Sequence, residues 1–362
     1  MIPRVTARID LAAIQHNLRA VRRFAPRSKV MAAVKADGYG HGAVAVARAL
    51  ESAAVDALAV ACLEEAMALR QGRIMETPIA LLEGVISGEE AAQAVYAQLQ
   101  VVVHDHWQIE LLHQLGPTAQ VSVWFKLDSG MHRLGFPLAD VPKLQAALKA
   151  HAGWKLQGWM THLACADETG NAFTREQIAR FDAALKDVSG PRSIGNSAGL
   201  IAWPEARADW VRPGLMLYGA SPLPDRSAAQ LGLKPAMTLE SRLIAIREYA
   251  RGEGIGYGQL YRCPENMKIG VVSVGYADGV HRSLGAGTPL LVHGRRVPLV
   301  GRVSMDMISV DLREVPQAQV GDVVRLWGEG LPVEEIAQHA GTLAYELLCG
   351  LTQRVLFRHV NG

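Results

Sequence analysis

The sequence lacks the features that mark disulfide-rich, zinc-binding, secreted or membrane-spanning proteins. It has only four cysteines, which are far apart and form no C-x-x-C pair: Cys62, Cys165, Cys263 and Cys349. This spacing predicts neither a disulfide framework nor a metal site. The first residues, MIPRVTARID, contain no apolar segment of a secretory signal, and no apolar run is long enough to span a bilayer. We therefore expect a cytoplasmic protein with reduced cysteines, no metal and no membrane partner.

An excess of charge of one sign is also missing. The 37 lysines and arginines nearly balance the 35 aspartates and glutamates, which leaves a formal net charge of +2. No basic run is long enough to follow a phosphate backbone, so we expect no nucleic-acid partner. Neither G-x-G-x-x-G nor G-x-x-x-x-G-K-[ST] occurs, which argues against a dinucleotide-binding fold and against a nucleotide P-loop.

What the sequence does contain is a regular alternation of apolar strands with helical patterns. Asp10 can cap a first helix, because apolar residues from Leu11 to Val21 recur at helical spacing. Eight apolar strands follow, at residues 28–35, 56–62, 78–84, 99–104, 121–128, 156–162, 192–197 and 210–219. Repeated β–α units of this kind are typical of a parallel sheet, and eight of them predict a closed (β/α)8 barrel, the TIM barrel. An open doubly wound sheet is the alternative.

The composition and the periodicity of the sequence change near residue 230. Strands rich in valine and isoleucine then alternate with glycine and proline turns, and helical periodicity is scarce outside residues 333–339. We therefore predict an α/β barrel over residues 1–229 and a mostly β domain over residues 230–362. The segment before Asp10, residues 1–9, can pair with the second domain instead of the barrel.

Polar side chains follow the predicted barrel strands, where the chemistry of a (β/α)8 barrel lies. They come from five strand ends: Lys35, Lys126, Asp128, Arg133, His162, Asn196, Ser197 and Arg212. Together they predict a cationic pocket suited to an anionic ligand such as a phosphate. The stretches GNSAG and RPGLMLYG add small residues whose free N–H groups can cradle phosphate, although ordinary turns use the same residues.

The stretch VKADGYGHG, residues 34–42, places Lys35 behind an apolar strand and in front of three glycines. A lysine acts as a nucleophile or base only without its proton, and an apolar setting favours that form. The glycines allow a sharp turn and the close approach of a ligand. A lysine on a barrel strand together with phosphate-binding loops indicates a Schiff base with pyridoxal phosphate. The competing interpretation is a lysine that extends into water from a strand end.

The motifs resemble those of the alanine racemase family over nearly the whole chain. They occur in order as VKADGYGHG, KLDSGMHRLG, THLACADE, NSAG, VRPGLMLYG, GIGYGQLY, VSVGYADG, GRVSMDM and YELLCGL. Decarboxylases of basic amino acids share this fold but have a different glycine-rich loop and a cysteine-containing motif, neither of which is found here. A non-enzymatic pyridoxal-phosphate carrier built on the barrel alone would not need the second domain with Tyr257.

The resemblance implies a racemase that interconverts L-alanine and D-alanine through an external aldimine of pyridoxal 5'-phosphate by a two-base mechanism. Lys35 would serve the α-proton of D-alanine, and Tyr257 would serve that of L-alanine from the opposite face. Tyr257 would enter the active site of a partner subunit, so a homodimer is expected. D-Alanine would be supplied for peptidoglycan or degraded as a nutrient.

The resemblance also assigns roles to further residues. Arg212 would face the pyridine nitrogen, with His162 behind it, and Lys126 would be a position that can be carbamylated and would orient Arg133. The cofactor-binding set would comprise Lys35, Tyr39, His162, Asn196, Ser197, Arg212, Gly214 and Leu215. The substrate-binding set would comprise Arg133, Tyr276, Met305 and Asp306.

Three positions depart from the family pattern. Gln353 stands where many relatives have a tyrosine that reaches the phosphate, and Leu356 stands where they have a proline. His132 replaces a smaller residue expected before Arg133. One phosphate contact and the shape of the substrate entrance are therefore expected to differ from those of such relatives.

Overall fold

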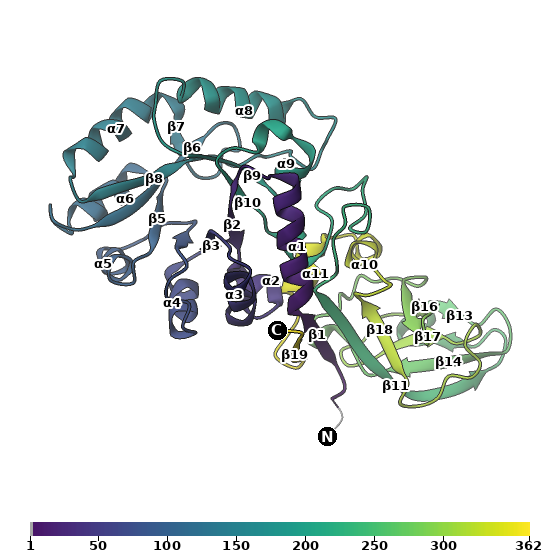
Figure 1. Cartoon of the computed structure of the whole chain (residues 1–362). Coiled ribbons are helices and arrows are strands. Elements are labelled where there is room, and N and C mark those ends of the chain that lie inside the picture. Colours follow the sequence, from purple (N-terminus) through teal and green to yellow (C-terminus); the bar gives the residue numbers. More distant parts are fainter. Residues whose placement is uncertain (1–2) are drawn as a thin grey trace. The chain divides into compact units, whose positions relative to one another are not determined.

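The computed structural model describes residues 3–362, which form two compact units (Figure 1). One unit comprises residues 15–217 and 222–227. The other combines residues 3–14 with residues 218–221 and 228–362.

Residues 15–217 contain a parallel barrel of eight strands. These are β2 (Lys29–Ala33), β3 (Ala57–Val60), β4 (Ile79–Leu81), β5 (Gln100–Val103), β6 (Val121–Asp128), β8 (Trp154–Met160), β9 (Arg192–Asn196) and β10 (Trp210–Arg212). Each strand pairs in parallel with the next, and β10 pairs with β2, so the sheet closes on itself. The predicted (β/α)8 barrel is confirmed, and the open doubly wound sheet was wrong.

Small and large apolar side chains fill the barrel interior. Trp124 is fully buried there, and its indole N–H donates to Gln100 Oε1 at 2.8 Å. The same cluster contains Met31, Ala57, Ala59, Ala80, Val102 and Met160. Because this packing closes the centre of the barrel, ligands are left to bind at the strand ends.

Helices alternate with the barrel strands as the sequence predicts. Asp10 Oδ1 accepts a hydrogen bond from Ala13 N at 3.2 Å, as expected for a residue that caps the first helix. The helices are α1 (Leu11–Phe24), α2 (Lys35–Gly40), α3 (Ala43–Ser52), α4 (Leu63–Gln71), α5 (Gly88–Tyr96), α6 (His106–His113), α7 (Val141–Ala150), α8 (Phe173–Ala184) and α9 (Ser197–Ala202). Shorter elements are β7 (Phe136–Pro137), η1 (Leu138–Asp140), η2 (Pro204–Ala206) and η3 (Leu215–Tyr218).

The other unit is built on an eight-stranded sheet. Its strands are β1 (Thr6–Asp10), β11 (Met237–Tyr249), β14 (Met267–Val272), β15 (Pro289–Val292), β16 (Arg295–Val300), β17 (Ile308–Asp311), β18 (Val323–Trp327) and β19 (Leu356–Val360). The long strand β11 pairs with both β14 and β18, which closes six of the strands into a ring. Strand β1 pairs antiparallel with β11 and parallel with β19, so residues 6–10 belong to this sheet. Residues 1 and 2 of the predicted segment lie outside the described residues.

Few helices accompany this sheet. Helix α10 (Val333–Ala340) matches the periodicity noted in the sequence, whereas α11 (Ala344–Cys349) was not predicted, because six residues are too few for a periodic pattern. The short helix η5 (Tyr276–Asp278) follows β14.

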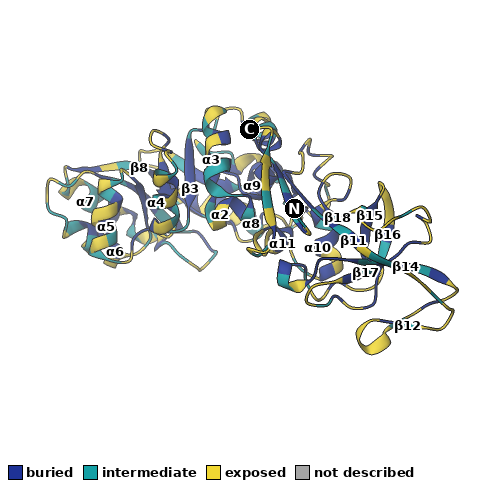
Figure 2. Ribbon diagram, turned by 90° about the horizontal axis from the view of Figure 1, so that it is seen from below, coloured by how far each residue is buried: buried dark blue, intermediate teal, exposed yellow. Residues whose placement is uncertain are grey.

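Strands β12 (Gly254–Ile255) and β13 (Tyr261–Arg262) form a hairpin around η4 (Tyr257–Gln259). This hairpin is largely exposed (Figure 2). Across residues 3–362, no helix has the length and apolar composition needed to cross a membrane.

Candidate active site

The turn after β2 is left-handed. Residues 36–39 have φ between +51° and +62°, and three of the four are not glycine: Ala36, Asp37 and Tyr39. Each such residue costs roughly 1–2 kcal/mol for an L-amino acid. The turn is held by hydrogen bonds from Ala43 N to Asp37 Oδ1 and from Ala36 N to Glu65 Oε1, both 2.7 Å long. The glycines predicted a sharp turn, but not that its strained positions would be occupied by other residues.

This turn places Tyr39 against the end of β10. Tyr39 is buried, and a Cβ added to Gly214 would lie 2.3 Å from the Tyr39 hydroxyl oxygen, so a side chain at position 214 would displace Tyr39. Ser197 Oγ accepts hydrogen bonds from Gly214 N at 2.9 Å and from Met216 N at 3.4 Å. The predicted phosphate-binding residues Tyr39, Ser197, Gly214 and the adjacent Leu215 therefore lie together at the carboxyl ends of β2, β9 and β10.

Asn196 links β9 to α9. Its Oδ1 accepts a hydrogen bond from Gly199 N at 2.8 Å, which caps the helix that begins at Ser197. The motif GNSAG thus gives a strand end, a cap and a helix start in consecutive residues. Its fixed backbone orients Ser197 toward the end of β10.

Arg212 is a buried cation at the end of β10, with 7% of its surface exposed. Its guanidinium donates to Ser193 Oγ at 2.6 Å, to Ile194 O at 3.2 Å and to Thr161 O, and lies 3.3 Å from His162 Nδ1. Burial lowers the pKa of Arg212 to about 10, so it stays charged at neutral pH. Within residues 3–362, no carboxylate forms an ion pair with it.

The neighbouring side chains share this positive environment. Burial, and then the charges of Arg212 and other cations, lowers the pKa of His162 well below its ordinary value, so its imidazole is neutral. Burial likewise lowers the pKa of Lys126 to about 8, with further contributions from Arg212, Arg133 and Lys35. Lys35 is half-buried, and Arg133 is exposed. An anionic ligand at this end of the barrel would be strongly favoured.

The second predicted group lies in the other unit. Tyr257 begins η4 in the β12–β13 hairpin, and 72% of it is exposed. Tyr276 N donates to Ser304 O at 3.1 Å, and a Cβ on Gly275 would lie 2.2 Å from Met305 O. Tyr276 and Met305 therefore lie on adjoining segments, although their motifs are separated in the sequence.

Arg354 joins these segments and was not predicted from the sequence. Its guanidinium lies 2.8 Å from Asp306 Oδ1 and 3.2 Å from the buried Asp278 Oδ1. Asp278 also accepts a hydrogen bond from Gly275 N at 2.9 Å. Ion pairs between residues so far apart in the chain leave no local sequence signal. The Asp306 carboxylate is thus held by Arg354, which follows the exposed Gln353.

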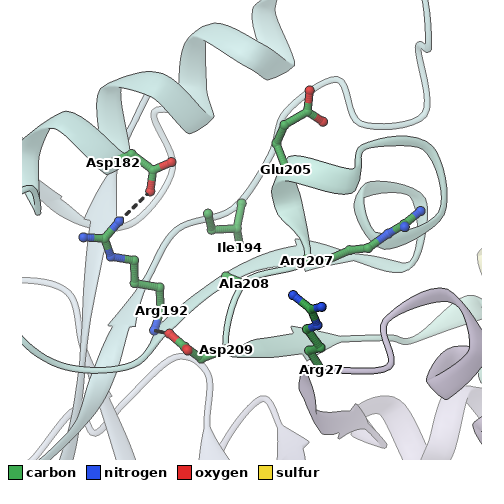
Figure 3. Close-up of a pocket in the computed structure, with 8 residues that line it drawn as sticks. All are labelled: Arg27, Asp182, Arg192, Ile194, Glu205, Arg207, Ala208 and Asp209. Carbon is green, nitrogen blue, oxygen red and sulfur yellow. Dashed lines mark hydrogen bonds and ion pairs between the residues drawn. The ribbon is translucent and has the colours of Figure 1, made fainter.

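A cavity of about 330 Å³ opens at the opposite, amino-terminal ends of the barrel strands (Figure 3). It is lined by Arg27, Asp182, Arg192, Ile194, Glu205, Arg207, Ala208 and Asp209. Arg192 donates to Asp182 Oδ1 at 2.9 Å, and its amide donates to Asp209 Oδ2 at 2.8 Å. Opposite charges pair within this cavity, whereas the cations near Lys35 face few carboxylates.

The donors near Lys35 suit an aromatic ligand with a phosphate group. The buried hydroxyls of Tyr39 and Ser197 meet the backbone at Gly214, which has no room for a side chain. Arg212 offers a fixed positive charge, and Lys35 offers an amine. These features fit pyridoxal phosphate, the group that the sequence motifs imply.

Comparisons with known proteins agree over both units. Residues 9–222 match the family model described as alanine racemase, N-terminal domain, and residues 236–359 match the model described as alanine racemase, C-terminal domain. The alanine racemase of Nitrosococcus oceani is 51% identical over 351 residues, which are 96% of this chain and 97% of that protein.

Solved structures give the same result. The biosynthetic alanine racemase from Pseudomonas aeruginosa is 47% identical, with a TM-score of 0.95 over 99% of this chain and 100% of that one. The alanine racemase from Bartonella henselae, solved with covalently bound pyridoxal phosphate, is 27% identical, with a TM-score of 0.90 over 99% of this chain and 100% of that one.

Proposed function

The chain belongs to the alanine racemase family of pyridoxal-phosphate-dependent isomerases, and we propose that Lys35 and Tyr257 are the two bases with which it interconverts L-alanine and D-alanine. The observation that supports this most directly is the group of cations and small donors at the carboxyl end of the barrel, where Lys35 follows β2. The decarboxylase and carrier alternatives lose their support, since both family models are those of the racemases.

The barrel residues have distinct parts in holding the cofactor. Lys35 would form the covalent attachment, while Tyr39, Ser197 and the backbone of Gly214 and Leu215 would bind the phosphate. Asn196 fixes the loop that presents Ser197. When bound, pyridoxal phosphate acidifies the Cα proton of an attached amino acid by drawing electrons into its ring.

Arg212 limits how strongly the ring draws electrons. A carboxylate at the pyridine nitrogen of the bound cofactor would keep that nitrogen protonated, whereas Arg212 stays charged and could only donate a hydrogen bond there. The neutral His162 behind it supplies no further proton. We infer that this pairing discourages transamination and other side reactions at some cost in Cα acidity.

The proton transfers need one base on each face of the planar carbanion. Lys35 removes or returns the proton on the face of the D-isomer, and Tyr257 does so on the face of the L-isomer. Because Tyr257 is exposed on its hairpin, we propose that it enters the site of a second subunit in a homodimer. We propose Arg133 as the substrate-binding residue of the barrel, and Tyr276, Met305 and Asp306 as the substrate-binding residues of the β unit.

Lys126 has the properties of a carbamylation site. A carbamate forms from an uncharged amine and carbon dioxide, and a pKa of about 8 leaves an appreciable uncharged fraction at neutral pH. The resulting negative charge among Arg133, Arg212 and Lys35 would relieve their repulsion. We propose that this carbamate orients Arg133 toward the substrate carboxylate.

The domain boundary and cellular role are part of the same proposal. We propose that the barrel domain ends near residue 229 and that the β domain follows it to residue 362, with the N-terminal strand β1 contributed to the sheet of the β domain. The enzyme acts in the cytoplasm, where it supplies D-alanine for peptidoglycan or begins the degradation of D-alanine.

The activity is tested by proton NMR of L-alanine in D2O with the holoenzyme and by chiral analysis of the product. Loss of the α-proton signal together with appearance of D-alanine is expected. Retention of the signal by a protein that binds pyridoxal phosphate at Lys35 would contradict alanine as substrate, and release of carbon dioxide would point to a decarboxylase.

Shared sites are tested by mixing two inactive proteins. Lys35→Ala and Tyr257→Phe chains should regain activity on mixing, because one of the two sites in a hybrid dimer then has both bases. If subunits exchange, as a size or affinity tag can report, and activity stays absent, each site is formed by one chain.

A further inference from the structure

The loop between β6 and β7 contains Arg133, and both of its ends lie at the end of β6. It leaves the barrel at Asp128, and β7 then pairs in parallel with the end of β6, with Leu127 opposite Phe136 and Asp128 opposite Pro137. Residues 129–135 therefore form a closed loop whose two ends are fixed on the same strand. Arg133 lies within this loop, at the carboxyl end of the barrel.

One carboxylate organises the interior of this loop. Asp128 Oδ1 accepts hydrogen bonds from Gly130 N at 2.9 Å and from His132 N at 3.1 Å. Asp128 Oδ2 lies 2.9 Å from His132 Nδ1. Both carboxylate oxygens are therefore used, and His132, which immediately precedes Arg133, is held by its backbone and by its side chain.

These bonds hold a backbone conformation that His132 would not adopt alone. Its φ is +55°, in the left-handed region that residues other than glycine rarely occupy. The far side of the loop is fixed by packing, because a Cβ on Gly135 would lie 2.6 Å from Asp128 N. The conformation of His132, directly before Arg133, thus depends on the Asp128 carboxylate, whereas Gly135, two residues after Arg133, packs against the Asp128 backbone.

We propose that Asp128 is a positioning residue that sets the backbone of Arg133 for the substrate carboxylate, with His132 as the tether that joins the two. The inference rests on the proposed role of Arg133 in binding substrate. In this inference Asp128 acts only through the loop, by way of its hydrogen bonds to Gly130 and His132.

The charge state of Asp128 is consistent with this role. Burial raises the pKa of its carboxyl, but the amide hydrogen bonds from His132 and Gly130 and the His132 imidazole outweigh burial, so the pKa lies below its ordinary value. The carboxylate is therefore ionised at neutral pH and can accept all three bonds. The exposed imidazole of His132 faces water on its other side.

The test compares kcat and KM for L-alanine in holoenzyme variants. Asp128→Ala should raise KM about tenfold and lower kcat less than about threefold, since a displaced Arg133 weakens substrate binding. His132→Ala loses the tether and keeps the strained φ, so KM should rise about threefold. His132→Gly should stay within about twofold of the parent, because glycine adopts this φ freely and still donates its amide to Asp128.

A matched control separates positioning from a general loss of structure. His106 Nε2 and Asp140 Oδ2 form a similar pair at 3.0 Å between α6 and η1. Asp140→Asn should leave KM unchanged. Every variant compared should still unfold cooperatively above the assay temperature and keep the cofactor absorbance spectrum of the parent.

Trypsin gives a readout that needs no catalysis. Cleavage after Arg133, followed by mass spectrometry, should be faster in Asp128→Ala and His132→Ala than in the parent, and unchanged in His132→Gly and Asp140→Asn. An unchanged KM and cleavage rate in folded Asp128→Ala would overturn the inference, as would equal damage in His132→Gly and His132→Ala. Absence of racemisation in the parent would instead refute the proposed function, while the cleavage rates would still report on the loop.

Discussion

The carboxyl end of the barrel and the exposed face of the β unit are built in opposite ways. At the barrel end, Arg212 is 7% exposed and Lys126 has a strongly lowered pKa, so charge is held away from water. In the β unit, 72% of Tyr257 and 52% of Met305 are exposed. The first surface is organised by burial within one chain, whereas the second presents large side chains to solvent.

This difference indicates how the two bases are supplied. Charges held in a dry, fixed environment act strongly and need no rearrangement during the reaction, which suits the group that binds the cofactor. Exposed aromatic and methionine side chains are typical of surfaces that are covered by another protein. The comparison therefore supports a cofactor site formed by one subunit and completed by the surface of a second.

The largest loss of activity is expected when the amine of Lys35 is removed from the carboxyl end of the barrel. Lys35→Ala should lower kcat by about 10³-fold or more, because the attachment and one base are lost together. Lys29→Ala, at the start of the strand β2 that precedes Lys35, is the control and should keep its activity. A D-alanine-specific coupled assay measures the racemisation rate of both variants. A loss of less than tenfold in Lys35→Ala would exclude that lysine as a base.

The next effect concerns the exposed hairpin. Tyr257→Phe should lower racemisation by about 10²–10³-fold, yet Lys35 should still exchange the α-proton of D-alanine in D2O. Tyr261→Phe, in the same hairpin but part of its packed base, is the control. Equal loss of exchange for both isomers in Tyr257→Phe would argue against separate bases on the two faces.

A third prediction concerns the stability cost of burying the charge of Lys126 at the end of the barrel. Unfolded Lys126 titrates near 10.5 and folded Lys126 near 8, so the unfolded chain holds more protons between these pH values and stability rises with pH across them. Lys126→Met should therefore raise the free energy of unfolding by about 2–3 kcal/mol at pH 7 and by little above pH 10.5. Urea unfolding of the cofactor-free chain in carbonate-free buffer measures this.

Lys155→Met, an exposed position on β8, is the control for the third prediction. It should change the unfolding free energy by less than about 0.5 kcal/mol at either pH. A pH-independent gain in Lys126→Met would mean that its stabilisation comes from packing rather than from removal of a buried charge.

The smallest effect tests the left-handed turn. Ala36→Gly should raise the free energy of unfolding by about 1 kcal/mol, because glycine adopts the φ of +51° without strain. Ala45→Gly, inside α3, should instead lower it by about 1 kcal/mol. Denaturant unfolding of both variants measures these changes in the free energy of unfolding. A loss of stability in Ala36→Gly would show that the turn is not strained.

The sequence predicted the architecture well, because barrel strands buried on both faces read as continuous apolar runs and the strands of the β unit are bounded by glycine and proline. The same local signals could not show Ala36 in a left-handed turn, since the bonds that hold it come from distant Glu65 and from Ala43. Nor could they show Arg354, whose partners are brought near only by the closed sheet. The roles of the individual site residues remain predictions, which the experiments above address.

The pairing of β1 with β11 and β19 also sets an order for folding during synthesis. Strand β1 is made first, but its partners lie at residues 237–249 and 356–360. The barrel strands, from β2 to β10, are complete by residue 212 and can close while β1 is still unpaired. A nascent chain therefore has a long interval in which β1 is without either of its partner strands, and a chaperone that covers the unpaired backbone groups of β1 would be most useful then.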